Sequence, residues 1–144
     1  MSRSAAFASA ALRHLRDARM LARPSLDQAW HLVGFGPECA LKACLSQEWQ
    51  PRAVGHQTTL TGVAAEWILE LDPIARRRGA TAPSDPLQGW TTNVRYDRTG
   101  TAAASNIDID AVIAVATQAV ERQLADLWTS GDLEDDVLRE GPAS

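Results

Sequence analysis

The chain has 144 residues, of which 45% are hydrophobic and 22% charged, and its formal net charge at neutral pH is −4. This length predicts about one domain, and the composition is globular rather than disordered. The apolar runs are too short for the roughly 20 residues of a membrane span, and no strongly basic domain indicates nucleic acid. We therefore expect one domain over residues 1–130. An acidic tail over 131–144 holds Asp132, Glu134, Asp135, Asp136 and Glu140 against Arg139.

The first predicted helix runs from about Ser4 to Ala22. Its apolar residues recur every three or four positions, which places them on one side of the helix. Pro24 ends the helix, because proline lacks an N–H and disfavours helical geometry in the residue before it.

The second predicted helix begins after Ser25, a typical N-cap residue, and its apolar pattern continues to Leu45. The segment Gly34-Phe35-Gly36-Pro37 interrupts this pattern. Because a proline within a helix removes a hydrogen bond and clashes with the preceding turn, we expect a kink or break near Pro37. Cys39 and Cys44 would point to different faces of this helix. No disulfide is expected between them, which indicates a reducing, cytoplasmic compartment.

The remaining segments are also predicted to be helical or irregular. A loop over 47–59 leads to a helix over about 60–71, and Pro73 to Gly79 are expected to add one further turn. Residues 81–101 are the least regular part, a long loop of the kind that often carries function. The clearest periodicity runs from Ile109 to Gly131, capped by Asn106 or Asp108. The alternation of a sheet is absent. The sequence thus predicts an all-α, up-and-down bundle of four to five helices.

A short stretch of the second helix carries a family resemblance. The aromatic–glycine pair Phe35-Gly36 leads into Glu38-Cys39-Ala40-Leu41-Lys42, after a first helix rich in Arg and Ala and a proline. This stretch resembles the prokaryotic HEPN domain. His56 ahead of a helix, and Trp90 ahead of Val94-Arg95-Tyr96, fit the same subgroup. The resemblance covers residues 5–130.

The resemblance implies a helical bundle that forms a homodimer and binds nucleotides or RNA. Many members pair with a minimal nucleotidyltransferase in toxin–antitoxin or defence systems. Catalytic members are metal-independent ribonucleases that use an Arg and a His four to six residues apart. Imidazole acts there as acid or base at the 2′-hydroxyl, and guanidinium stabilises phosphate charge. Here three residues separate Arg52 from His56, seven separate Arg23 from His31, and no His follows Arg95. The ribonuclease motif is therefore absent.

Two groups of polar residues are candidate ligand contacts. Arg95, Tyr96 and Arg98 are the foremost, because two guanidiniums beside a phenol can hold phosphate and stack a base. Four further residues fall near one face of an unbroken second helix, where they line a cavity or a dimer seam or form a salt-bridged polar face. They are Asp27, His31, Glu38 and Lys42. Glu38 and Lys42 stand at i, i+4, a spacing that predicts an ion pair, which either stabilises the helix or, as the resemblance implies, is buried near the site face.

The other polar candidates have simpler interpretations beside the functional one. His56 is either a nucleotide-binding or acid/base residue, or a residue that caps the third helix. One helix supplies too few ligands for a metal site, and the cysteines lack a base to activate them. Two arginine clusters could also meet phosphate or stay solvated. They are Arg13, Arg16, Arg19 and Arg23 on the first helix, and Arg76, Arg77 and Arg78.

The tryptophans divide into two sets. Trp30, Trp67 and Trp128 fall on apolar helix faces and are expected in the core or at a dimer interface. Trp49 and Trp90 lie in or near loops and are expected to be freer to contact a partner.

Three functional interpretations follow. The first is a HEPN-like module that binds a nucleotide, RNA or a nucleotidyltransferase without the ribonuclease motif, a cofactor or a metal. The second is an enzyme with a nuclease-like site around His31, Glu38, His56 and Arg95. The third is a structural dimerisation or adaptor subunit that uses the acidic tail as a contact.

Overall fold

The computed structural model describes residues 3–46, 48–50, 71–79, 87, 90, 94 and 96–129. Its elements are all helical in these ranges: α1 (Arg3–Leu21), α2 (Leu26–Val33), α3 (Phe35–Cys44), α6 (Pro73–Arg77), α7 (Thr101–Ala104) and α8 (Ile109–Thr129). The predicted all-α bundle is confirmed. Only Leu71 of the predicted helix over 60–71 is among the described residues, and the tail over 131–144 lies outside them.

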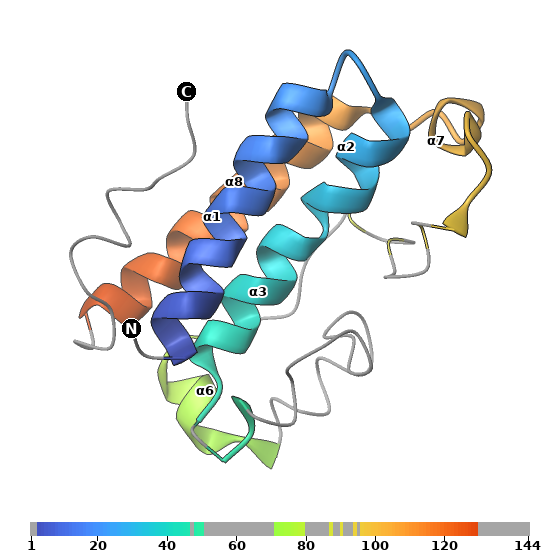
Figure 1. The fold of residues 1–144 in the computed structure, drawn as a ribbon. Helices are drawn as coiled ribbons and strands as arrows, with labels where there is room; N and C mark the ends of the chain where they lie inside the picture. The colour runs from blue at the N-terminus through green and yellow to red at the C-terminus, as the bar shows by residue number, and fades with distance from the viewer. Residues whose placement is uncertain are drawn as a thin grey trace.

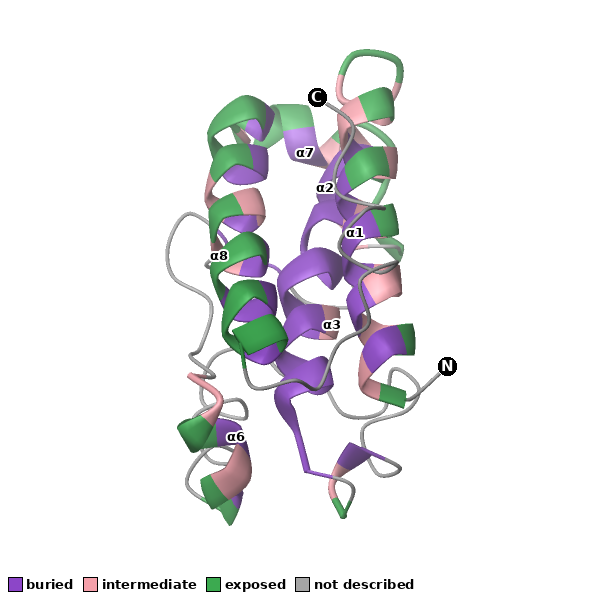
Figure 2. Cartoon of the chain, turned by 90° about the vertical axis from the view of Figure 1, so that its left-hand side faces the viewer, coloured by how far each residue is buried: buried purple, intermediate pink, exposed green. Residues whose placement is uncertain are grey.

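The body of the bundle consists of α1, the consecutive helices α2 and α3, and α8. In Figure 1, α1, the α2–α3 pair and α8 run alongside one another, with α6 at one end and α7 at the other. α1 packs on α2 and α3, and α8 packs on α3 and α1. α3 is buried nearly all round, whereas α1 and α8 keep an exposed outer face (Figure 2). None of the described helices is long and apolar enough to cross a membrane.

The α1–α3 contact depends on small side chains. Alanine is the best helix former, and in α1 it also occupies the buried face. A Cβ added at Gly36 of α3 would lie 2.8 Å from Cδ2 of Leu15, so the two helices approach closely there. Ala5, Ala8, Ala11, Leu15 and Ala18 have no exposed surface. The bounds of α1 agree with the prediction to within one residue at each end.

The second helix bends at Gly34, which confirms the expected interruption. Ser25 caps α2, with its Oγ accepting a hydrogen bond from Gln28 N at 3.4 Å. α2 ends at Val33 and α3 starts at Phe35. Pro37 therefore lies in the first turn of α3. N–H groups in a first turn have no partner within the helix, so a proline costs little there. The pivot is Gly34 rather than Pro37.

Trp90 fills the bend, so the expectation that it is free to contact a partner was wrong. Its side chain is buried, and Nε1 donates to the carbonyls of Trp30 at 2.8 Å and His31 at 3.3 Å. A Cβ at residue 34 would lie 2.0 Å from the indole ring, so only glycine fits. Phe35 packs edge-on against the same indole, with ring centroids 5.0 Å apart.

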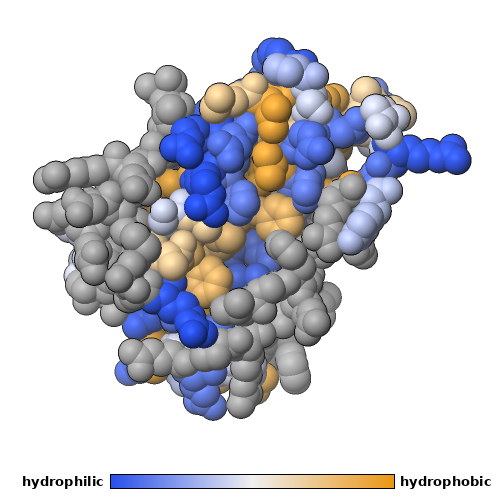
Figure 3. Space-filling model, viewed as in Figure 1, coloured by the Kyte–Doolittle hydropathy of each residue, from blue (hydrophilic) through white to orange (hydrophobic). Residues whose placement is uncertain are grey.

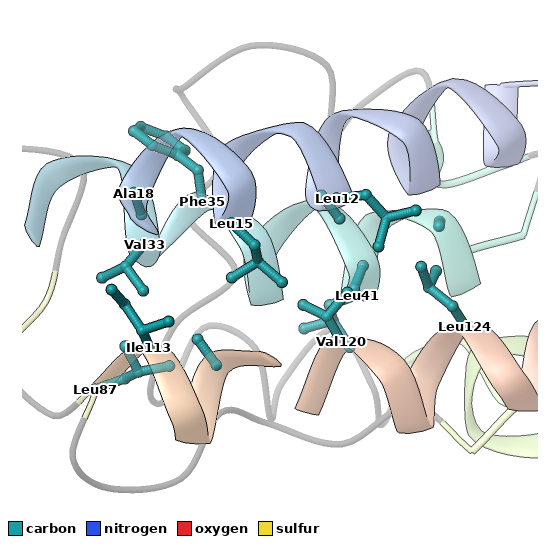
Figure 4. Packing of buried hydrophobic residues seen from close by; sticks show 14 of the residues in the cluster. Leu12, Leu15, Ala18, Val33, Phe35, Leu41, Leu87, Ile113, Val120 and Leu124 are labelled. Atoms are coloured by element: carbon teal, nitrogen blue, oxygen red, sulfur yellow. The ribbon is translucent and has the colours of Figure 1, made fainter. Parts of the chain in front are cut away.

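The last long helix closes the core. Asp108 caps α8, because its Oδ1 accepts a hydrogen bond from Ala111 N at 3.2 Å. Figure 4 shows Val120 and Leu124 of α8 facing Leu41 of α3 and Leu12 of α1. Trp128 is 39% exposed at the end of the helix, which excludes the core as its place and leaves the predicted dimer interface untested, whereas Trp30 is buried as predicted.

Polar side chains close the end of α3. Arg78 Nη1 donates to the carbonyls of Cys44 and Leu45, each at 3.1 Å. Asp72 is buried and accepts a hydrogen bond from Ser46 N at 2.9 Å, while its other oxygen caps α6. The further turn expected after Pro73 is thus confirmed as α6, fixed to the base of the bundle.

Candidate functional site

Tyr96 and Arg98 lie on the surface immediately before α7. Tyr96 is 73% exposed, and Arg98 is exposed as well. The backbone around them is ordered by turns: Asp97 N donates to Val94 O at 3.1 Å, and Thr101 Oγ1 donates to Arg98 O at 2.6 Å. Arg95, the third member of the predicted cluster, lies outside the described residues.

Asp27 anchors this segment to α2. Its Oδ2 accepts a hydrogen bond from Gly100 N at 2.8 Å, and its Oδ1 accepts one from Ala102 N at 3.1 Å. These two hydrogen bonds lower the pKa of the Asp27 carboxyl, and the bond from Gly100 has the larger effect. Gly100 has φ 92°, a left-handed value that favours glycine. Asp27 was predicted on a polar stripe, and in the structure it caps α7 instead.

Glu38 and Lys42 form a buried ion pair. Lys42 Nζ lies 2.7 Å from Glu38 Oε1, and the side chains are 5% and 1% exposed. Although the atoms are close, the contact lacks hydrogen-bond alignment, and Oε2 has no hydrogen-bond partner among the described residues. Removing both charges from water is costly, and mutual attraction compensates only in part. The pair predicted from i, i+4 spacing thus exists, but within the core.

His31 belongs to an aromatic group at the bend. Its ring meets the edge of Phe35 with centroids 5.3 Å apart, and Nδ1 lies 3.3 Å from Gln28 Oε1. The ring of His14 also contacts Phe35, with ring centroids 5.4 Å apart. The bend at Gly34 therefore divides the predicted stripe, because His31 contacts Phe35 whereas Glu38 pairs with Lys42. His56 lies outside the described residues.

The cysteines are poor nucleophiles. Burial, and then the charge of Glu38, raise the pKa of the Cys39 thiol to about 12, against smaller opposing effects of Lys42 and Arg13. Cys44 is buried, and its Sγ donates to Ala40 O at 3.4 Å. Both residues are thiols rather than a disulfide. Within the described ranges, no group of three or more His, Cys, Asp or Glu is placed to hold a metal ion.

Most of the arginines at the C-terminal end of α1 are engaged with neighbours. Arg19 Nη2 donates to Thr117 Oγ1 of α8 at 2.8 Å, and Arg16 lies 3.8 Å from Asp17. Arg23 donates to Asp110 at 2.6 Å, and this hydrogen bond raises the pKa of Arg23. On the face of the molecule that Figure 3 shows, hydrophilic side chains flank a narrow hydrophobic strip. The carboxylates of Asp17 and Asp110 reduce the positive charge that Arg16 and Arg23 offer to a phosphate.

The structure also contains a polar pocket that was not predicted from the sequence. A pocket of about 340 Å³ lies between α6 and the end of α8 and is lined by Arg77, Arg78, Gly79, Asp126 and Thr129. The Arg76–Arg78 run was visible in the sequence. Its meeting with Asp126 depends on the packing of two elements far apart in the chain, which the local pattern does not reveal.

Comparison with protein-family models, with curated proteins and with solved structures finds no match to this chain.

Proposed function

We propose that the chain is a HEPN-like helical module that binds a nucleotide or single-stranded RNA through Tyr96 and Arg98, and that it acts by binding rather than by catalysis. The observation that carries this proposal is the pair of exposed side chains on a segment fixed to α2 by Asp27.

The chemistry of the pair suits such a ligand. A phenol ring is a sequence-tolerant platform for a base, and guanidinium binds phosphate with charge-assisted hydrogen bonds. Because Asp27 holds Gly100 and Ala102, the segment loses little further freedom when a ligand arrives, and less affinity is spent on ordering it.

The surroundings of Glu38 favour binding over a nuclease-like site. A general base has to reach the proton that it removes, directly or through one water. Glu38 is 1% exposed and held against Lys42, and the Cys39 thiol stays protonated near neutral pH. Both groups support the fold in this interpretation.

The HEPN resemblance extends the proposal to partners. It suggests a homodimer and an association with a nucleotidyltransferase, as in toxin–antitoxin or defence pairs. Native mass spectrometry of the protein purified from its host tests this part, since it reports subunits, nucleotide and RNA together. A bare monomer would contradict it.

The binding site is tested with a fluorescently labelled single-stranded RNA, with ATP as a competitor. Stacking contributes about 1–3 kcal/mol per base, so Tyr96→Ala should weaken binding about fivefold to a hundredfold, and Tyr96→Phe should keep most of it. Arg98→Ala should weaken binding about tenfold.

Arg76→Ala is the matched control. It removes the same charge from an exposed arginine of α6, at the opposite end of the bundle in Figure 1. If Arg76→Ala and Arg98→Ala weaken RNA binding equally, attraction is non-specific and the proposed site is wrong. Absence of binding by the unmodified protein would refute it as well.

A further inference from the structure

The pocket between α6 and α8 lies where hydrogen bonds join α6 to the rest of the bundle. Arg78 donates to the carbonyls at the end of α3, and Gln123 Nε2 of α8 donates to Arg78 O at 3.4 Å. These contacts fix α6 against the base of the bundle. The volume of about 340 Å³ is at the lower end of the range of small-molecule pockets.

The α6 side of the pocket carries two arginines, of which Arg78 donates to the end of α3, and the α8 side carries one carboxylate, Asp126. Arg77 and Asp126 both line the pocket, and no ion pair joins them or links either one to another described residue. Both side chains are exposed, so each is available to a ligand that enters from solvent.

The carboxylate of Asp126 lies close to Gly79. Gly79 has φ 77°, and a Cβ there would lie 2.4 Å from Asp126 Oδ2. The absence of a side chain thus lets the carboxylate lie directly against the turn that follows α6.

The end of α8 adds negative potential on the same side. The last carbonyls of a helix lack partners within it and carry the negative end of the helix dipole. Thr129 Oγ1 donates its hydrogen to Ala125 O at 2.9 Å, so it offers lone pairs to the pocket. A cationic group is therefore favoured beside Asp126 and Thr129, and an anionic group beside Arg77.

We infer that this pocket binds a small zwitterion of the free amino acid type, with its carboxylate at Arg77 and its ammonium group at Asp126. The site lies on different elements from Tyr96 and Arg98. A negative result for amino acid binding therefore leaves the proposed RNA binding untouched, and the reverse also holds.

The test is an NMR titration of the full ¹⁵N-labelled chain with pools of the common free L-amino acids. We expect one or more of them to shift the amide signals of Gly79 and Thr129. For the active amino acid, the N-acetyl derivative, which lacks the ammonium group, and the amide derivative, which lacks the carboxylate, should each bind at least about tenfold more weakly.

Charge-neutral variants assign the two contacts. Arg77→Gln and Asp126→Asn should each weaken binding about tenfold or more, and Arg76→Gln, outside the pocket on the same helix, should leave it unchanged. Both lining residues are exposed, so the fold should persist, and the amide spectrum verifies this directly. No shift with any amino acid, equal binding of the N-acetyl derivative, or unchanged binding by Asp126→Asn would each overturn the inference.

Discussion

The bend at Gly34 allows a sharp test of the packing. Gly34 has helical angles, φ −70° and ψ −24°, so by backbone preference alone Gly34→Ala should stabilise the fold by about 0.4–1 kcal/mol. The added Cβ, however, would lie 2.0 Å from two ring atoms of Trp90. A rigid, buried indole has no small adjustment that relieves such a contact. We therefore expect Gly34→Ala to destabilise the protein.

The magnitude lies between two limits. Overpacking a core typically costs about 1–3 kcal/mol. The upper limit is complete expulsion of the indole, comparable to Trp90→Ala at about 3–5 kcal/mol. With the hydrogen bond from Nε1 to Trp30 O also lost, we expect Gly34→Ala to lower the free energy of unfolding by about 3 kcal/mol.

Urea unfolding followed by far-UV circular dichroism measures this change. As a control, the same substitution is made in a protein that already carries Trp90→Ala. Once the indole is gone, Gly34→Ala should become neutral or stabilising by up to about 1 kcal/mol. If Gly34→Ala is neutral or stabilising in the unmodified protein, the indole does not occupy the bend and the reasoning fails.

Three further predictions concern charged and ionisable groups. Lys42→Met should destabilise the fold by about 3–5 kcal/mol in urea unfolding, because it leaves Glu38 buried without its partner. The lowered pKa of Asp27 means that its stabilisation is complete above the ordinary carboxyl pKa of about 4 and is lost as the pH falls through the lowered pKa. The urea midpoint of Asp27→Asn should thus approach that of the unmodified protein in acid. The Cys39 thiol, with its pKa near 12, should react with iodoacetamide at pH 8 about three orders of magnitude more slowly than a peptide thiol.

Each of these has its own control. Adding Glu38→Leu to Lys42→Met should restore most of the lost stability, since neither charge then remains buried. A pH-independent gap between Asp27→Asn and the unmodified protein would show that Asp27 does not titrate with folding. Mass-spectrometric detection of rapid Cys39 labelling would contradict the raised pKa of this thiol.

The helices with a strong local pattern could be predicted from the sequence. The apolar periodicity of α1 and α8, the cap at Ser25 and the turn after Pro73 depend on residues a few positions apart. The interruption of the second helix was also visible, although its pivot is Gly34. Proline is the usual signal for a kink, but a proline in a first turn fits the helix without strain.

The long-range contacts could not be predicted in the same way. Trp90 was assigned to a loop, and its burial depends on the space left by Gly34, far away in the chain. The spacing of Glu38 and Lys42 predicted a pair, but burial depends on which helices surround α3. Asp27 gave no local sign that it would cap α7. The local pattern shows which face of a helix is apolar. Which of these faces pack against each other depends on contacts throughout the fold.

The two hydrogen bonds that Asp27 accepts from Gly100 and Ala102 form a clasp between α2 and α7. This clasp has a consequence for the order in which the chain folds. α1, α2 and α3 follow one another, so their contacts close short loops and can form early. The clasp joins residues 73 positions apart, and the hydrogen bond of Trp90 spans 60. During synthesis from the N-terminus, the α1–α3 hairpin would be complete while the face of α3 that α8 covers is still exposed. The segment with Tyr96 and Arg98 can take its place only once Gly100 and Ala102 have been synthesised, so the surface proposed to bind forms later than the α1–α3 hairpin on which it rests.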